Sequence, residues 1–132
     1  MYTIIRALLI ALLLASTSAF GQVRTTDIYF VPWKKETLVP LDASDVRERP
    51  AVRTEIVNRY LAQSLLEWLR SESFLKPPEV NLPQNFRLVI DFKLEDGSVE
   101  SYYANRQLLL EVKSGKVRKI DEEFKSRFSS FL

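Results

Sequence analysis

The stretch FRLVIDFKLEDGSVESYYA, residues 86–104, decides the fold. Apolar and polar residues alternate on both sides of the Asp-Gly pair at 96–97, a pattern that predicts a β-hairpin. Asp-Gly tolerates the positive φ angles of a two-residue type I′ turn. Such a turn would place Leu94 directly opposite Val99 and would fix the register of the whole hairpin.

The predicted register gives this hairpin one apolar face and one polar face. We expect the apolar face to pack against a helix, and the polar face to be solvent-exposed and to form part of a partner surface. A cross-strand ion pair between Lys93 and Glu100 is expected on the polar face. The expected apolar face holds Phe86, Leu88, Ile90, Phe92, Leu94, Val99 and Tyr103, and the polar face holds Arg87, Asp91, Lys93, Glu100 and Tyr102.

A long amphipathic helix is predicted over residues 50–71, with Pro50 at its first position. Apolar residues recur there at three- and four-residue spacings and form a wide stripe, as in helices that pack across a sheet. A partner helix or a membrane surface is the alternative for this stripe. Its members are Ile56, Tyr60, Leu61, Leu65, Trp68 and Leu69.

Shorter elements complete the predicted fold. Ser44 or Asp45 is expected to cap a short helical turn, and Asp121 to cap a C-terminal helix. The order of elements predicts an α+β domain: a mainly antiparallel sheet of about four or five strands, packed on one long helix, with a short C-terminal helix. Further strands are expected at residues 27–33, 107–113 and 116–120, and a proline-rich spacer at 76–85.

The first residues have the features of a signal peptide. Arg6 supplies a positive charge, residues 7–15 (ALLIALLLA) form an apolar segment too short to span a bilayer, and small residues up to Gly21 provide a cleavage site. We therefore predict a signal peptide at 1–21 and a single globular domain at 22–132. The mature chain is expected to be soluble, without membrane insertion, in a bacterial periplasm or outside the cell.

The composition excludes several chemistries. The chain has no His and no Cys, which removes Ser-His-Asp and Cys-His catalysis and metal sites built on imidazole or thiolate. The charges nearly balance, with 19 Lys and Arg against 17 Asp and Glu, so nothing favours nucleic acid. We predict no enzyme activity, no cofactor and no metal site.

Asp91 is the best candidate for a catalytic carboxylate of the glycosidase type. Its expected neighbour Arg87 disfavours the protonated acid that such catalysis needs, so a surface ion pair is the preferred interpretation. The acidic groups at 42 with 45, at 95 with 96 and at 121–123 lack the spacing of a calcium loop and suit caps and turns.

Aromatic and basic residues also gather near the expected strand ends. Aromatics and arginine are enriched among the residues that dominate protein interfaces. The sequence leaves open whether this cluster or the polar face of the hairpin is the contact surface. The cluster comprises Trp33, Lys34, Lys35, Tyr102, Tyr103, Arg106 and Arg118, and the predicted partner-binding residues are Arg87, Asp91, Lys93, Glu100, Tyr102, Arg106 and Trp33.

These observations favour a small exported protein-binding module. Periplasmic inhibitors and immunity proteins are the analogy in fold class and location, and no motif assigns the chain to a family. The alternative is a carrier of a small apolar ligand or lipid. A carrier would need a cavity between Leu65, Trp68, Phe92 and Tyr103, where the large side chains predict solid packing instead.

Overall fold

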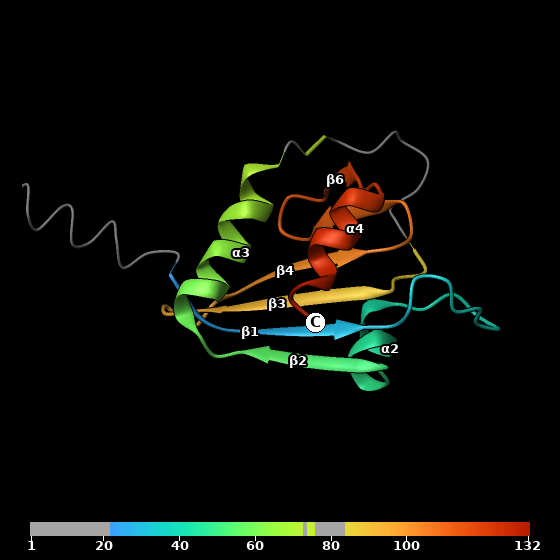
Figure 1. The fold of residues 1–132 in the computed structure, drawn as a ribbon, viewed down its shortest axis with the longest axis horizontal. Coiled ribbons are helices and arrows are strands. Elements are labelled where there is room, and N and C mark those ends of the chain that lie inside the picture. The colour runs from blue at the N-terminus through green and yellow to red at the C-terminus, as the bar shows by residue number, and fades with distance from the viewer. Residues whose placement is uncertain (1–21, 73, 76–83) are drawn as a thin grey trace, which may run out of the picture.

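The computed structural model describes residues 22–72, 74–75 and 84–132. These residues form a six-stranded antiparallel sheet with three helices, in the strand order β2-β1-β3-β4-β5-β6 (Figure 1). The predicted α+β class is therefore confirmed, with six strands in place of four or five. The elements are β1 (Val23–Phe30), α2 (Ala43–Glu48), β2 (Val52–Ile56), α3 (Arg59–Ser71), β3 (Leu88–Leu94), β4 (Val99–Ala104), β5 (Leu108–Glu111), β6 (Lys116–Lys119) and α4 (Glu122–Ser129).

Two of the sequence predictions fall outside this description. The signal peptide at 1–21 and most of the proline-rich spacer, residues 76–83, lie outside the described residues. The prediction of export therefore rests on the sequence alone.

Helices cover the two faces of the sheet unequally. The longer helices α3 and α4 lie side by side over one face, while the short helix α2 covers one end of the other (Figure 1). The face under α3 and α4 carries the larger core, in which Leu65, Ile90 and Phe92 are fully buried. The smaller cluster under α2 includes Val46 and Val89.

The central hairpin forms where it was predicted, but its register is one residue away from the prediction. Lys93, and not Leu94, lies opposite Val99, and Ile90 lies opposite Tyr102. A shift of one residue exchanges the faces of every side chain on one strand. The side chains of β4 therefore lie on the opposite faces of the sheet from those predicted from the sequence.

The turn explains this shift. Leu94 and Ser98 close the hairpin through a 2.9 Å backbone hydrogen bond, so three residues form the loop instead of two. Gly97 adopts φ 85°, the left-handed conformation that ends the common three-residue loop. The carboxylate of Asp96 accepts hydrogen bonds from the Ser98 N–H at 2.9 Å and the Ser98 hydroxyl at 2.6 Å, which stabilises the turn.

The register shift exchanges the environments of two neighbouring tyrosines. Tyr102 is fully buried under α3 and packs edge-on against Phe92, with ring centroids 5.8 Å apart. Tyr103 is half-buried on the opposite face and packs against Phe86. The predicted exposure of Tyr102 and burial of Tyr103 on the helix face are both wrong.

The long helix begins later than predicted. Residues 52–56 form β2 instead, and α3 spans 13 residues from Arg59. The helix begins after Asn58, whose side chain accepts a hydrogen bond from the Leu61 N–H. Alternating valine, threonine and isoleucine favour a strand at 52–56, and β1 lies beside it as a pairing partner.

The shorter helices begin at acidic caps. Asp42 caps α2 in a reciprocal capping box with Asp45, so the predicted cap at Ser44 or Asp45 is two or three residues too late. Asp121 caps α4 and accepts a hydrogen bond from the Phe124 N–H at 2.8 Å, as predicted. Two glutamates in the first turn of α4 complement the helix dipole.

Candidate partner-binding site

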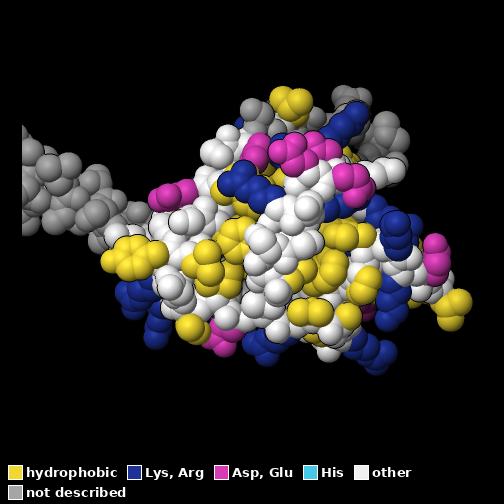
Figure 2. All heavy atoms as spheres, in the orientation of Figure 1, with side chains coloured by type: hydrophobic (Ala, Val, Ile, Leu, Met, Phe, Trp, Pro, Cys, Tyr) yellow, Lys and Arg dark blue, Asp and Glu magenta, His cyan; other side chains and the backbone are white. Residues whose placement is uncertain are grey.

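A hollow of about 660 Å³ opens beside α4, at the end of strand β1. Its floor is apolar, and its walls come from three separate parts of the chain: the end of β1 with the loop that follows, the β4–β5 connection, and one side of α4. Figure 2 shows apolar atoms in the open beside α4, with Lys and Arg side chains to their right. The lining residues are Phe30, Pro32, Trp33, Lys34, Arg106, Glu122, Lys125, Ser126 and Ser129.

Trp33 is the largest side chain in this hollow. Strand β1 ends at Phe30, and Pro32, which has no N–H to donate to a sheet, follows in the loop. The Trp33 ring then packs edge-on against Phe30 with centroids 5.3 Å apart. The ammonium group of Lys125 lies 5.5 Å from the centre of the Trp33 ring, in cation–π range. Trp33 is thereby held between the sheet and α4 while remaining partly exposed.

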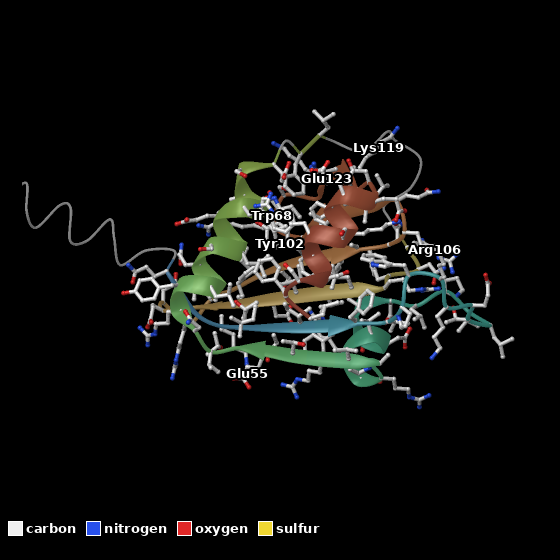
Figure 3. The ribbon with its side chains drawn as sticks, viewed as in Figure 1. Glu55, Trp68, Tyr102, Arg106, Lys119 and Glu123 are labelled. Carbon is white, nitrogen blue, oxygen red and sulfur yellow. The ribbon has the colours of Figure 1, made fainter. Side chains whose placement is uncertain are left out.

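Arg106 fixes the loop that carries Trp33. Its Nε donates a short hydrogen bond to the carbonyl oxygen of Trp33, and its Nη2 donates to the carbonyl oxygen of Lys35 at 3.1 Å. Among the described residues, only the carboxylate of Glu36 lies within 4 Å of the Arg106 guanidinium, at 3.9 Å, and Glu36 is almost fully exposed. Arg106 therefore shapes the wall of the hollow, and Figure 3 places it at this end of the sheet.

A second arginine, Arg87, lies behind the same loop and is almost fully buried. It donates hydrogen bonds to the carbonyl oxygen of Lys35 at 2.9 Å and to the side-chain oxygen of Asn85 at 2.6 Å. Burial, and then the charge of Arg106, lower the pKa of Arg87. Its Nε atom has no hydrogen-bond partner within the part of the chain that the structure describes. Two guanidinium groups thus converge on one backbone carbonyl, and no carboxylate forms an ion pair with Arg87 among the described residues.

The surroundings of the hollow are consequently positive. Lys34, Lys125 and Arg106 line it against a single carboxylate, Glu122, which pairs with Lys125 at 3.3 Å. Buried Arg87, on the inner side of the loop that carries Trp33, adds a further positive charge. An apolar floor with a cationic wall suits a partner segment that combines an apolar side chain with carboxylates.

The polar face of the hairpin contains a buried structural cluster instead of an exposed patch. Asp91 is 9% exposed and accepts two hydrogen bonds from Arg47 of α2, at 2.8 and 2.9 Å. Arg47 also donates to the Tyr103 hydroxyl, and Ser101 donates to Asp91 at 2.7 Å. The hydrogen bonds to Asp91 raise the pKa of Arg47. The predicted solvent exposure of Asp91 and Arg87 is therefore wrong, and the partner of Asp91 is Arg47.

The predicted ion pair between Lys93 and Glu100 is also absent, because the two residues lie on opposite faces of the sheet. Lys93 lies 3.1 Å from Asp27 on the neighbouring strand, and the hydrogen bond to Asp27 raises the pKa of Lys93. Glu100 lies on the helix face and accepts two hydrogen bonds from Arg70 of α3. The hydroxyl of buried Tyr102 donates to the same carboxylate at 3.3 Å.

The structure thus brings only part of the predicted site together. Trp33 and Arg106 line the hollow. Arg87 does not line it, but it donates a hydrogen bond to Lys35 in the loop after β1 that carries Trp33. The other four predicted residues make contacts within the fold: three lie under helices, and Lys93 pairs with a neighbouring strand. Their positions are Asp91 under α2, Lys93 beside β1, and Glu100 and Tyr102 under α3.

The contribution of α4 was missed by the sequence reasoning. Glu122, Lys125, Ser126 and Ser129 recur at three- and four-residue spacings, so one side of the helix carries all four. That spacing is visible in the sequence, opposite the buried pair at 124 and 128. Only the fold shows that this side borders the loop after β1.

The described residues contain no group of three or more acidic side chains placed to hold a metal ion. No helix among them is long and apolar enough to cross a bilayer.

The chain was compared with family models, curated proteins and solved structures. None of the three comparisons found a match. The hollow beside α4 is therefore the feature of the molecule that bears on its function.

Proposed function

We propose that this protein is an exported, non-enzymatic binding module that recognises a partner protein through the hollow beside α4. The observation that carries the proposal is the lining of that hollow, where partly exposed Trp33 lies among Lys34, Arg106 and Lys125. Residues of this kind dominate the binding energy of many protein interfaces. The partner segment it suits carries carboxylates around an apolar or aromatic side chain.

The proposal of a non-enzymatic role rests on side-chain chemistry. The chain has neither histidine nor cysteine. Asp91, the best candidate for a catalytic carboxylate, accepts hydrogen bonds from Arg47 and Ser101 instead of facing an open cleft. Export rests on the signal-peptide features of residues 1–21, and a periplasmic or extracellular location follows from them.

The positions of the side chains do not fit the alternative function, a carrier of an apolar ligand. It required Leu65, Trp68, Phe92 and Tyr103 to surround one space, but Tyr103 lies on the opposite face of the sheet from the other three. Trp68 is packed against Phe124 at a centroid distance of 4.9 Å. We therefore favour the binding module.

A comparative pull-down from periplasmic extract tests the proposal. The wild-type domain is compared with Ser126→Glu, which places a carboxylate at the wall of the hollow, and with Lys119→Glu, a control that adds the same charge at an exposed position on β6. A true partner is captured by the wild type and by Lys119→Glu, and is lost with Ser126→Glu. Capture that is equal for all three proteins would overturn the proposal for this surface.

A further inference from the structure

Strand β2 forms an outer edge of the sheet, with β1 as its neighbour on the inner side (Figure 1). It is five residues long, and its side chains are mostly exposed. An open strand edge is a template for pairing with another strand, and proteins usually shield such edges with charge, proline or a covering element. What pairs with this edge depends on which backbone groups face outward.

The hydrogen bonds of β1 determine which residues of β2 face outward. Val31 donates its N–H to the carbonyl of Arg87 on the β3 side, while the carbonyl of Phe30 accepts from Ala51 on the β2 side. Successive residues of a strand direct their backbone groups to alternate sides.

The same alternation applies along β2. Val52, Thr54 and Ile56 lie opposite Phe30, Ile28 and Thr26, whose backbone groups face β2. Those three residues therefore bond inward to β1. The N–H and C=O groups of Arg53 and Glu55 point away from the sheet, and they have no hydrogen-bond partner within the described ranges.

The sequence around this edge is self-complementary. Residues 51–57 read AVRTEIV. In an antiparallel pair of two copies centred on Thr54, Arg53 of each copy lies opposite Glu55 of the other. Val52 lies opposite Ile56, Ala51 lies opposite Val57, and Thr54 lies opposite itself. Opposite charges, β-branched pairs and threonine pairs are the cross-strand combinations that stabilise sheets.

The outward backbone groups agree with this register. Arg53 and Glu55 would form the hydrogen-bonded pairs, and both have outward-facing amides. Thr54 would form the non-hydrogen-bonded pair on the symmetry axis, and its amide already faces β1. Shifting the pair by two residues in either direction also keeps the outward-facing amides hydrogen-bonded. These two registers place Arg53 opposite Arg53 or Glu55 opposite Glu55, and like charges directly opposite each other are unfavourable.

We propose that two copies of this protein associate through β2, in an antiparallel pair centred on Thr54, to form one continuous sheet across the dimer. The charge complementarity of Arg53 and Glu55 selects a second copy as the occupant of this edge. Pairing would also cover Val52 and Val57, which are 42% and 69% exposed in the single chain. Figure 3 shows Glu55 at this edge of the sheet, where the partner strand would lie.

Disulfide cross-linking of single-cysteine variants tests the register directly, because the chain contains no native cysteine that could compete. In the proposed dimer, the Cα atoms of the two Thr54 residues lie about 4.5 Å apart, within the range of a disulfide. Thr54→Cys should therefore form a covalent dimer under mild oxidation. Arg53→Cys and Glu55→Cys would place the cysteines on a diagonal of about 7–8 Å and should cross-link far less.

Charge reversal tests the pairing without covalent chemistry. Glu55→Arg gives two Arg–Arg contacts across the seam, and Arg53→Glu gives two Glu–Glu contacts, so each variant alone should dimerise at least about tenfold more weakly. A mixture of the two variants restores both opposite-charge contacts and should form heterodimers. Because Arg53 also lies 3.5 Å from Asp27, circular dichroism must confirm that Arg53→Glu is folded.

Proline provides the control for the free edge. Glu55→Pro removes an outward N–H and leaves the bonds to β1 in place, so it should give a folded monomer. Sedimentation of the mature domain over a range of concentrations should show a dimer for the wild type and a monomer for this variant. A wild-type monomer at every concentration, or preferential cross-linking of Arg53→Cys or Glu55→Cys, would overturn the proposal. Neither outcome affects the hollow beside α4, because no partner protein is present in these measurements.

Discussion

The two faces of the sheet hold their helices with different proportions of apolar and charged contacts. Beneath α3 and α4 the contacts are mainly apolar and aromatic, with Tyr102 packed on Phe92 and Trp68 packed on Phe124, and an ion pair joins Arg70 to Glu100. Figure 3 shows Tyr102 and Trp68 in the region between these two helices. On the other face, the short helix α2 buries a smaller apolar cluster around Val46 and is tied to β3 by the charged pair of Arg47 and Asp91. The comparison teaches that charged residues on a strand need not form a binding surface, and that the open site lies at the edge of the apolar face.

The largest difference between the faces should appear at the adjacent tyrosines. Tyr102→Ala removes a fully buried ring and should lower the free energy of unfolding by about 3–5 kcal/mol. Tyr103→Ala removes a half-buried ring and should cost about 1–2 kcal/mol. Urea denaturation measures both. A larger loss for Tyr103→Ala than for Tyr102→Ala would contradict the observed register.

The charged pair on the α2 face should give the next largest effect. Arg47→Ala leaves the buried Asp91 carboxylate with the Ser101 hydroxyl as its one remaining side-chain partner among the described residues and should cost about 1–3 kcal/mol. The estimate is below that for a fully buried pair, because the Arg47 side chain is 34% exposed.

A double-mutant cycle distinguishes the pair from general packing. In an Arg47→Ala background, Asp91→Ala should cost less than it does in the wild type. Additive losses would show that the two residues contribute independently.

The turn that sets the register can be tested at Gly97. Gly97→Ala places a side chain on a residue with φ 85° and should destabilise the domain by about 1 kcal/mol, although no described atom beyond the two adjacent residues lies within 4 Å of the added carbon. Gly97→Asn should cost less, since asparagine tolerates the left-handed region. Equal stability of Gly97→Ala and the wild type would contradict the three-residue loop.

The last effect appears only at alkaline pH. Burial raises the pKa of Tyr102, so the folded state favours the neutral phenol. The unfolded pKa is about 10, so this contribution to stability is complete below about pH 10 and is lost as the pH rises above it, by up to about 1.4 kcal/mol per pH unit. Tyr102→Phe should show a shallower loss of stability between about pH 10 and 11 in urea melts. An identical slope for the two proteins would indicate that Tyr102 is accessible to solvent.

The sequence predicted the elements that depend on local patterns. The α+β class, the central hairpin and the Asp121 cap follow from alternation, turn residues and capping chemistry. The register depended on a choice between loops of two and three residues, both compatible with Asp-Gly. The prediction of helix at residues 52–56 was wrong for a different reason. The amphipathic pattern of α3 extends into this segment, and its pairing with β1 is not visible in any local pattern.

The candidate site was predictable only in part. Trp33 and Arg106 were recognised by residue type, since aromatics and arginine favour interfaces. Their proximity depends on a hydrogen bond across 73 positions of the sequence, from Arg106 to the Trp33 carbonyl. The polar residues of the hairpin were misassigned because their partners, Arg47 and Asp27, come from elements distant in sequence.

Fluorescence of Trp33 tests the central claim most directly. The chain has two tryptophans, so Trp68→Phe leaves Trp33 as the only indole reporter, inside the hollow. We expect a short synthetic peptide that alternates glutamate with leucine and phenylalanine to change its emission saturably. A peptide with lysine in place of glutamate should not. Lys34→Glu should weaken the response, and Lys93→Gln on the opposite face should leave it unchanged. No response to the acidic peptide, or an equal loss for Lys93→Gln, would contradict the assignment of the binding surface to the hollow beside α4.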